Sequence, residues 1–326
     1  GLLVGICVAL ARNSFDVRVK SVQHLGELTG AANLGIIPFE SDVAQHPLKV
    51  FEDPRAPVSE AFRQLRASLQ FVDVDHPRKT VVVTSALPNE GKTTTLVNLA
   101  LAMASTGSRV LAIEADLRRP KLCDLLGLDR TVGLTNILSS GRVGPEQAIQ
   151  SWGGGLIDVL ASGPLPPNPS ELLGSQHMKF LLGQLRGSYE YILIDSPPLL
   201  PVTDSAALAP LTDGVILICR HKKTKFAQVG LAVDALNAVS SKLLGTVFTM
   251  VPGQESRSYG QLGYYAAADP RQSDSSRAAG LPADRPTPAD RSRRHGRASR
   301  TTTAAWTSAE LRDRPANPSL NWSGSG

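Results

Sequence analysis

The sequence predicts a doubly wound α/β fold with a mostly parallel sheet, and three observations support this. Between residues 80 and 251, short apolar runs rich in β-branched residues alternate with longer segments of helical composition. The runs are continuous and do not alternate with polar residues, as expected for parallel strands covered by helices on both faces. A glycine–lysine loop follows the first run, at the position where α/β folds bind phosphate. The prediction is therefore a P-loop NTPase fold.

Six apolar runs are the predicted strands. The first, residues 81–83, consists of three valines, and the others are residues 110–113, 156–160, 191–194, 215–219 and 244–251. A helix is predicted from Lys92 to about Ser105, between the first two strands, and Gly107 is expected to end it.

Another helix is predicted ahead of the sheet, in residues 60–71, with Ser59 as its N-cap. Its apolar residues fall three or four positions apart and form one stripe that is expected to be buried: Phe62, Leu65, Leu69 and Val72. On a neighbouring, more polar face, Glu60, Arg63 and Arg66 are also spaced three apart.

The charge of the chain is concentrated at its C-terminal end. With 326 residues, 42% of them hydrophobic, the chain has enough apolar material for a sizeable core. Residues 269–326 hold ten Arg and six acidic residues, which is +4 of the net +5. This composition predicts a solvated, disordered basic tail and no nucleic-acid partner. Three scattered cysteines without a CxxC pair, and histidines without metal-ligand spacing, argue against disulfides and a zinc site.

The N-terminal residues 1–11 are an apolar run that is shorter than the roughly twenty residues needed to cross a bilayer. Basic residues follow at once, as on the cytoplasmic side of a membrane helix, whereas a signal peptide carries its charge before the apolar run. The run is either the start of a buried helix or the C-terminal end of a transmembrane helix, and the second interpretation is favoured. Residues 12–57 are then a juxtamembrane connector, and residues 58–255 the folded domain.

A phosphate-binding loop is predicted in residues 84–94, between the first strand and its helix. The loop presents backbone N–H groups together with the positive end of the helix dipole. Gly91 allows close approach, Lys92 places charge on the β- and γ-phosphates, and the Thr93 hydroxyl is a ligand for Mg²⁺. ATP and Mg²⁺ are therefore the expected cofactors, and the expected contacts are Ala86, Pro88, Asn89, Glu90, Gly91, Lys92, Thr93 and Thr94. Ala86 stands where Gly is usual; the competing interpretation, an ordinary turn, is disfavoured by the position between strand and helix.

Acidic residues end two of the predicted strands. Asp195 follows one run, and Glu114 and Asp116 follow another. Because parallel strands bring their carboxyl ends to one edge of the sheet, these acids are expected beside Lys92. Carboxylates there hold Mg²⁺ directly or through water, so the predicted metal ligands are Thr93, Asp116 and Asp195.

On these residues the chain resembles the bacterial tyrosine autokinases that control capsule and exopolysaccharide assembly. They are relatives of the deviant Walker-motif ATPases that position division sites and plasmids. The resemblance covers roughly residues 1–265, and the three nucleotide motifs of the family match residues 86–93, 113–118 and 192–198. The family pattern Glu-x-x-Arg-x-x-Arg matches Glu60, Arg63 and Arg66. In the family this helix docks on the neighbouring subunit and helps to close a ring.

The resemblance implies a homo-oligomeric ring in which tyrosine tails enter adjacent active sites. It also implies a kinase domain on the cytoplasmic side of the bacterial inner membrane, attached through the N-terminal helix. The polysaccharide assembly machinery and a cognate tyrosine phosphatase are the implied partners. Residues 256–268 hold the implied phosphoacceptors, Tyr259, Tyr264 and Tyr265. The competing interpretation is that these tyrosines cover the edge of the domain.

Three positions depart from the family pattern. Glu114 stands where most members have Asp, Thr249 where relatives often have an Asn beside the base, and Asn89 replaces a frequent Gly of the P-loop. These departures leave open the role of Glu114 and the adenine contact.

The implied reaction is in-line transfer of the γ-phosphoryl group from Mg-ATP to a tail tyrosine, with Lys92, Glu114, Asp116 and Asp195 as catalytic residues. Glu114 or Asp116 accepts the hydroxyl proton or binds metal-bound water; the sequence does not separate these roles. The main alternative is a partitioning or site-selecting ATPase switch without kinase activity. Such proteins usually carry a second Lys early in the P-loop, and residues 85–88 have none. A third interpretation is a regulatory protein that binds ATP without turning it over.

Overall fold

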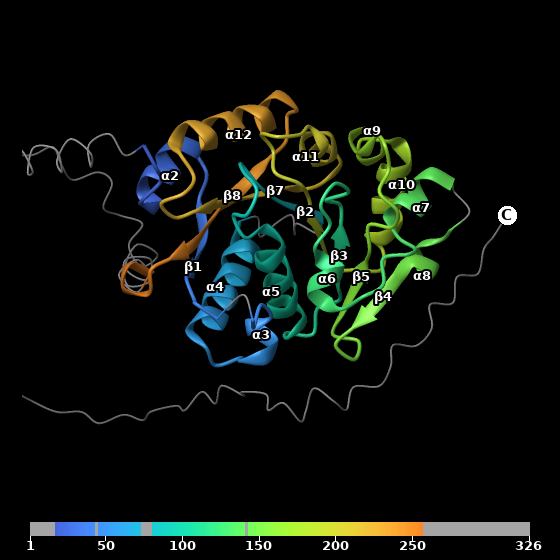
Figure 1. Ribbon diagram of the computed structural model, residues 1–326, viewed down its shortest axis with the longest axis horizontal. Coiled ribbons are helices and arrows are strands. Elements are labelled where there is room, and N and C mark those ends of the chain that lie inside the picture. Colours follow the sequence, from blue (N-terminus) through green and yellow to red (C-terminus); the bar gives the residue numbers. More distant parts are fainter. Residues whose placement is uncertain (1–16, 43–44, 73–79, 141–142, 257–326) are drawn as a thin grey trace, which may run out of the picture. The chain divides into compact units, whose positions relative to one another are not determined.

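An eight-stranded sheet forms the centre of the computed structural model, which describes residues 17–42, 45–72, 80–140 and 143–256 (Figure 1). The strand order is β1-β8-β7-β2-β6-β3-β5-β4, and the pairing is parallel except between β4 and β5. The strands are β1 (Asn33–Pro38), β2 (Thr80–Ser85), β3 (Val110–Glu114), β4 (Ile149–Trp152), β5 (Ile157–Leu160), β6 (Tyr191–Asp195), β7 (Gly214–Arg220) and β8 (Leu243–Val251). The predicted doubly wound, mostly parallel fold is confirmed.

Helices cover both faces of this sheet (Figure 1). One face packs against α3 (Lys49–Glu52), α4 (Pro57–Phe71), α5 (Lys92–Ala104) and α6 (Leu122–Leu126). The other packs against α2 (Val22–Thr29), α7 (Leu134–Ser140), α8 (Pro145–Ala148), α9 (Pro169–Leu173), α10 (Gln176–Leu185), α11 (Asp204–Leu208) with the short 3₁₀ helix η1 (Ala209–Leu211), and α12 (Phe226–Ala238).

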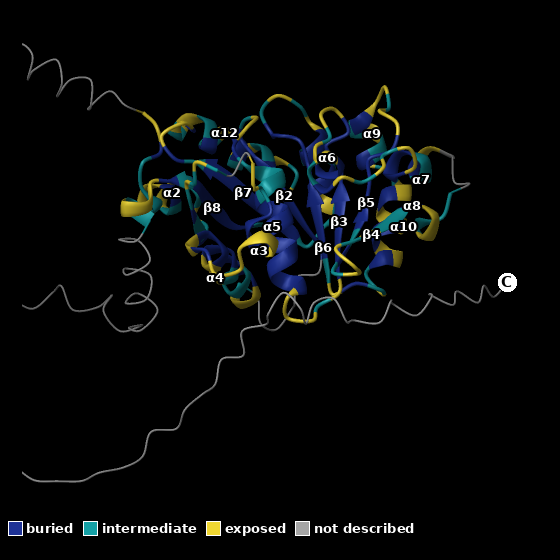
Figure 2. Ribbon diagram, turned by 60° about the horizontal axis from the view of Figure 1, so that its bottom comes forward, coloured by how far each residue is buried: buried dark blue, intermediate teal, exposed yellow. Residues whose placement is uncertain are grey.

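Two cores, one on each face, explain why the central strands are apolar along their length. In β2, Val81 and Val83 face the core under α4 and α5, whereas Val82 faces the core under α12. Successive strand residues point to opposite faces, so a strand covered on both faces needs apolar residues at every position. Figure 2 shows the result: the central strands are buried, and most exposed residues lie on the outer surfaces of the helices and in the loops.

The folded domain begins earlier than predicted. Strand β1 pairs in parallel with β8, and α2, capped by Ser21, precedes it. Both elements lie in residues 12–57, which were expected to be a connector. The difference arises because β1 forms by pairing with the distant strand β8, where Leu34 and Ile37 become buried. Local sequence does not reveal such a partner strand.

The predicted N-cap of α4 is wrong. The helix begins at Pro57, with Ala56 as N-cap, because proline's fixed φ and missing N–H suit the first helical position. Ser59 lies inside the first turn, where its hydroxyl donates to the carbonyls of Lys49 (3.0 Å) and Asp53 (2.7 Å). The predicted buried stripe is present, since Phe62, Leu65 and Leu69 are buried.

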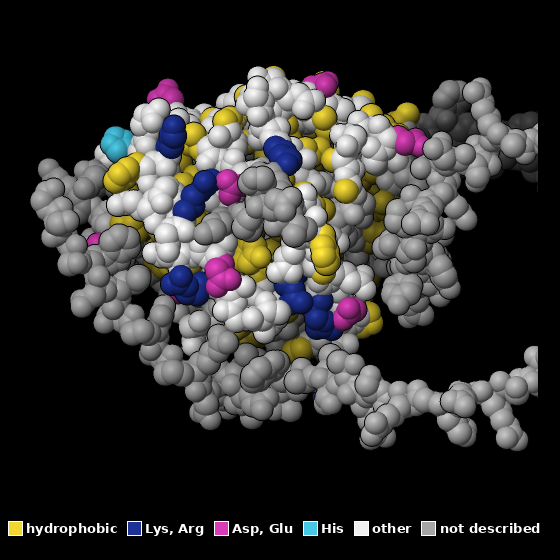
Figure 3. All heavy atoms as spheres, turned by 180° about the vertical axis from the view of Figure 1, so that it is seen from behind, with side chains coloured by type: hydrophobic (Ala, Val, Ile, Leu, Met, Phe, Trp, Pro, Cys, Tyr) yellow, Lys and Arg dark blue, Asp and Glu magenta, His cyan; other side chains and the backbone are white. Residues whose placement is uncertain are grey.

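Several predictions concern residues outside the described ranges: the apolar run 1–11, the tyrosines at 259, 264 and 265, and the basic tail 269–326. Among the described residues, no helix is both long and apolar enough to cross a membrane. On the uncovered part of the surface in Figure 3, Lys and Arg side chains lie in small groups, several of them beside acidic ones, and form no continuous basic face.

Candidate active site

A cavity of about 540 Å³ opens at the carboxyl ends of the central strands. One wall is the predicted phosphate loop, which contributes Pro88, Asn89, Gly91, Lys92, Thr93 and Thr94. The opposite wall comes from the segments after β3 and β6, and includes Asp116, Arg118, Pro197 and Pro198. The fold thus brings segments from three parallel strands around one space, as expected for the crevice of a doubly wound sheet.

The phosphate loop has the backbone that its glycine pattern predicts. Gly91, the residue before α5, has φ 93° and ψ 20°, and Asn89 has φ 62°. Both angles lie in the left-handed region, which Gly adopts freely and Asn tolerates better than most residues. Asn89 therefore keeps the loop conformation where the family often has Gly.

Contacts with β7 and β8 hold this loop in place. The Glu90 carboxylate is buried and accepts hydrogen bonds from the Leu87 amide (3.0 Å) and the Thr224 hydroxyl. The Thr249 hydroxyl donates to the Glu90 carbonyl (2.8 Å), and Arg220 donates to the Asn89 carbonyl (3.1 Å). Burial raises the pKa of Glu90, and the hydrogen bond from Thr224 opposes that shift.

The side chains of two predicted nucleotide contacts, Glu90 and Ala86, lie outside the cavity. The Glu90 side chain faces Thr224 and does not line the cavity, and Ala86 is fully buried outside it. The hydroxyl of Thr249, the position left open for adenine recognition, is used to anchor the loop. These roles depend on strands β7 and β8, more than a hundred residues further along the chain.

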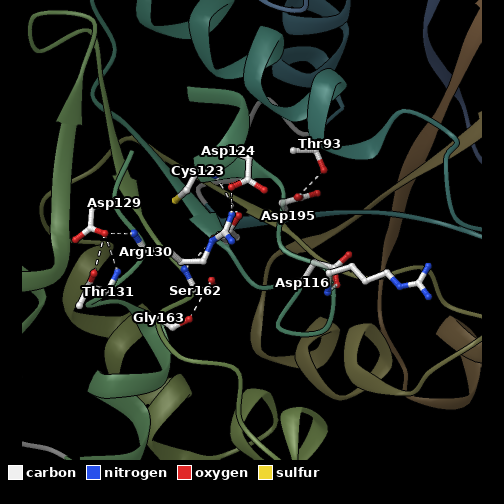
Figure 4. A network of polar contacts seen from close by, with 12 residues as sticks. Thr93, Asp116, Cys123, Asp124, Asp129, Arg130, Thr131, Ser162, Gly163 and Asp195 are labelled. Atoms are coloured by element: carbon white, nitrogen blue, oxygen red, sulfur yellow. Dashed lines mark hydrogen bonds and ion pairs between the residues drawn. The ribbon is translucent and has the colours of Figure 1, made fainter. Parts of the chain in front are cut away.

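Asp195 lies under the start of α5. Its Oδ2 accepts a 2.7 Å hydrogen bond from the Thr93 hydroxyl, as Figure 4 shows. Its Oδ1 is buried and has no hydrogen-bond partner among the described residues. Burial raises the pKa of Asp195 to about 6; Lys92 and the Thr93 hydrogen bond oppose the shift, while the charges of Asp116 and Glu114 add to it.

Asp116 lies on the cavity wall, only 6% exposed. Its Oδ2 is 3.7 Å from the Lys92 ammonium, and its Oδ1 accepts a hydrogen bond from the Arg119 amide (3.0 Å). The structure therefore brings Lys92, Thr93, Asp116 and Asp195 together, as predicted from the strand ends.

Glu114 does not join this group, although Glu114 or Asp116 was predicted to accept the hydroxyl proton or bind metal-bound water. It is fully buried and absent from the cavity wall. One carboxylate oxygen accepts from the Cys123 amide and the other from the Ser162 amide, both at 3.1 Å. The Arg130 Nε lies 3.3 Å from the second oxygen. The longer side chain of Glu, compared with Asp, reaches these distant partners, so Glu114 joins β3 to α6 and to two loops.

Arg130 extends that network to the surface. Its Nη2 donates a 2.6 Å hydrogen bond to Asp124, and Figure 4 shows the guanidinium between the labelled Asp124 and Ser162. Burial raises the pKa of the Cys123 thiol to about 12, and the neighbouring Glu114 charge adds to the shift. Cys123 therefore stays a neutral thiol at physiological pH.

A further ion pair at the cavity was not predicted from the sequence. The Arg118 Nε and Nη2 donate to the two oxygens of Asp204, at 2.8 and 3.0 Å, and the Ser170 hydroxyl donates to the same carboxylate. Asp204 is fully buried at the first turn of α11, whereas the Arg118 side chain is 45% exposed. The only sequence signal was an acidic residue opening a helix after a Pro-Pro turn.

The Glu60, Arg63 and Arg66 group lies on α4, away from the cavity. Arg63 donates to Glu60 (2.7 Å) and to the Pro54 carbonyl (2.9 Å). Arg66 donates instead to the Ala102 carbonyl of α5 (2.8 Å), so it holds α4 to its own domain.

The oxygen donors at the cavity fit Mg²⁺. Mg²⁺ prefers one or two carboxylates together with substrate phosphates and water, and it is rarely held by a cage made only of protein groups. The Thr93 hydroxyl, the Asp116 carboxylate and the unpartnered Oδ1 of Asp195 supply such oxygens. Among the described residues no group of three His, Cys, Asp or Glu side chains is placed to hold a metal.

Comparison with known proteins adds independent evidence. A family model described as an AAA domain matches residues 78–243, just over half of the chain. Tyrosine-protein kinase YwqD of Bacillus subtilis is 40% identical over 217 residues, which is 67% of this chain and 90% of that protein.

A longer relative matches over part of its length. Putative tyrosine-protein kinase EpsB of Ralstonia nicotianae is 32% identical over 259 residues, which is 76% of this chain and 34% of that protein. The chain thus spans about a third of that relative. Among solved structures, the kinase domain of the Escherichia coli tyrosine kinase ETK has a TM-score of 0.69 and 29% identity, covering 72% of this chain and 96% of that structure.

Proposed function

The chain belongs to the bacterial tyrosine-kinase family, and from this membership we propose that it is an autokinase that phosphorylates C-terminal tyrosines with ATP. The observation that carries the proposal is that Lys92, Thr93 and Asp116 line one cavity at the phosphate loop, while the buried Asp195 carboxylate accepts a hydrogen bond from Thr93. Several separate segments of the chain must fold together to place these groups. Two buried carboxylates beside a lysine are not expected at an ordinary strand-to-helix turn.

The phosphate loop and Lys92 are proposed to bind and orient the triphosphate. Backbone N–H groups at the start of α5 and the positive end of its dipole favour the phosphate oxygens. The Lys92 ammonium balances charge on the γ-phosphoryl group during transfer. Thr93 and Asp195 would hold Mg²⁺, which would supply further charge neutralisation to the triphosphate.

Asp116 is proposed as the acceptor of the tyrosine proton. It is the acidic residue on the cavity wall, whereas Glu114 is enclosed by backbone amides and Arg130. The tyrosine oxygen forms a bond to the γ-phosphorus as the bond from that phosphorus to the β,γ-bridging oxygen breaks. ADP leaves with the electron pair of that bond, and Asp116 takes the proton.

The acceptors are proposed to be Tyr259, Tyr264 and Tyr265, which lie beyond the described residues, in the segment that follows β8. We also propose a homo-oligomeric ring, because Glu60 is exposed on α4 and Arg63, beside it, is partly so. Attachment to the bacterial inner membrane through residues 1–11, and control of polysaccharide assembly opposed by a phosphatase, follow from the family resemblance.

The proposal is tested by measuring two products in one reaction. Purified chain is incubated with Mg-ATP, and released inorganic phosphate and protein-bound phosphotyrosine are counted together. A kinase gives phosphotyrosine that accounts for most of the ATP consumed. Continuous phosphate release without phosphotyrosine would favour the switch ATPase, and nucleotide binding with neither product would favour the non-enzymatic regulator.

A further inference from the structure

Positive charge is concentrated on one part of the cavity wall. The residues lining the cavity include five cations, Lys92, Arg118, Arg119, Lys121 and Arg220, and one acid, Asp116. Arg118, Arg119 and Lys121 all come from the segment between β3 and α6, and are here called the basic arm. Arg220 differs from them, because it ends β7 and donates to the phosphate loop at Asn89.

The sheet order separates the basic arm from Arg220. Strand β2, which leads into the phosphate loop, lies between β7 on one side and β6, then β3, on the other. In P-loops the lysine contacts the β- and γ-phosphates. Here the Lys92 ammonium lies 3.7 Å from Asp116, after β3. The γ end of a bound triphosphate therefore faces the basic arm.

The three cations of the arm are available for a ligand to different degrees. Arg118 is held by its two hydrogen bonds to the buried Asp204, so its orientation is fixed while 45% of its side chain remains exposed. Within the described ranges, the exposed Arg119 and Lys121 side chains have no hydrogen bond or ion pair. Other basic side chains are paired with acids, such as Arg63 with Glu60 and Arg186 with Asp213.

Phosphoryl transfer moves charge toward this arm. ATP and a tyrosine become ADP, tyrosine phosphate and a proton, and the tyrosine phosphate carries about −1.5 to −2 charges near neutral pH. The phosphate leaves the nucleotide at its γ end. Cations fixed on that side form charge-assisted hydrogen bonds with phosphate oxygens, and arginine forms them with two oxygens at once.

We propose that the basic arm is a subsite for tyrosine phosphate, which it holds in a phosphorylated tail segment beside bound ADP. The inference rests on the proposed kinase function, since that reaction generates this ligand. It predicts product inhibition, because a phosphorylated tail remaining on the arm blocks the entry of the next tyrosine.

The test measures binding without any transfer. The full chain carrying Tyr259→Phe, Tyr264→Phe and Tyr265→Phe is saturated with Mg-ADP and titrated against a fluorescent peptide of residues 256–268 phosphorylated at Tyr264. The unphosphorylated peptide is the matched probe, and phenyl phosphate is the competitor. Variants are Arg119→Gln with Lys121→Gln, and Arg118→Lys, which keeps charge but loses the paired bonds to Asp204. Lys179→Gln, at an exposed position of α10, is the control.

We expect the phosphorylated peptide to bind at least about tenfold more tightly than the unphosphorylated one, which corresponds to one charge-assisted hydrogen bond. The Arg119/Lys121 double variant should remove about tenfold or more of that affinity and reduce its salt dependence. Arg118→Lys should remove several-fold, and Lys179→Gln nothing. The affinity for a fluorescent ADP should change less than twofold in all variants.

Two results would overturn the subsite: equal binding of both peptides, or parallel losses of ADP and peptide affinity, which would assign the arm to the nucleotide. A separate assay of phosphotyrosine formation on the unmodified chain distinguishes the underlying function. Phosphopeptide binding on the arm without any phosphotyrosine formation would leave the subsite standing and reject the kinase. Phosphotyrosine formation without arm-dependent binding would do the reverse.

Discussion

The hydroxyl of Thr93 donates a 2.7 Å hydrogen bond to Oδ2 of Asp195, joining the start of α5 to the end of β6. The other carboxylate oxygen is buried without a hydrogen-bond partner among the described residues. A buried carboxylate with an open oxygen is unfavourable to the folded protein unless a cation or proton joins it. The buried Asp195 carboxylate therefore lowers the stability of the ligand-free fold and leaves an oxygen available to a ligand.

Asp195→Asn should stabilise the ligand-free protein and abolish stabilisation by Mg-ATP. The pKa of Asp195 is about 6 in the folded chain, above its ordinary value of 3.8, so ionisation opposes folding. Removing the charge should add at most about 2–3 kcal/mol near pH 7, or about 5 °C in melting temperature. The gain should be full above pH 6 and should vanish as pH falls below about 4. Thermal unfolding across this pH range, with and without Mg-ATP, checks it; a gain that is the same at every pH would contradict the charge argument.

Glu114→Gln should lower the stability of the fold while leaving nucleotide binding nearly unchanged. Both carboxylate oxygens accept backbone N–H groups, so an amide nitrogen on either side faces a donor, and Arg130 loses its charge partner. The expected loss is about 3 kcal/mol of unfolding free energy, measured with urea. Nucleotide affinity of the folded fraction should stay within about threefold.

Arg130→Met is the matched variant for this pair. It should destabilise by a similar amount, and the double variant should lose less than the sum, because the two side chains share one interaction. If Glu114→Gln left stability unchanged but stopped phosphoryl transfer, while Arg130→Met had no effect on transfer, then Glu114 would be the base after all.

Thr249→Val should weaken nucleotide binding by about fivefold. The substitution keeps the β-branched shape but removes the 2.8 Å hydrogen bond to the Glu90 carbonyl, worth about 1 kcal/mol, that holds the phosphate loop in shape. Thr246→Val, on the same strand, is the control, since the Thr246 hydroxyl is buried without a hydrogen-bond partner among the described residues. That variant should bind normally and be no less stable. Titration with a fluorescent ADP measures both, and equal effects would reject the anchoring role of Thr249.

Arg63→Glu should reduce the oligomer size without unfolding the domain. The Arg63–Glu60 pair is on the surface and contributes about 0.5 kcal/mol or less, so the melting temperature should barely change. Lys179→Glu, on α10, makes the same charge change elsewhere and should leave assembly intact. Sedimentation velocity distinguishes the two variants. Arg66→Ala should instead lower stability, because Arg66 donates to α5 within the same chain.

The fold could be predicted because its signals are local. Six of the eight strands are largely buried on both faces, so their continuous apolar sequence was enough to predict them, and Lys92 marked the loop between strand and helix. Strands β1 and β4 were not predicted, each for a different reason. The first looked like part of a proline-punctuated connector, and the second, Ile149–Trp152, has only four residues, half of them polar.

The candidate site could be predicted only in part. Parallel topology placed Asp116 and Asp195 beside Lys92 without knowledge of any contact. The orientation of the Glu114 side chain depends on its contacts with Arg130 and Ser162. The role of Arg118 depends on its ion pair with Asp204. The role of Thr249 depends on its hydrogen bond to Glu90. These partners lie between 16 and 159 residues away, and no local pattern reports such pairings.

The most direct test of the central claim is to map phosphotyrosine by mass spectrometry after incubating the full chain with Mg-ATP, beside Lys92→Met. The account predicts phosphate on Tyr259, Tyr264 or Tyr265 in the unmodified chain and none in Lys92→Met, with both proteins equally folded by circular dichroism. A chain that binds and hydrolyses ATP but carries no phosphotyrosine would contradict it.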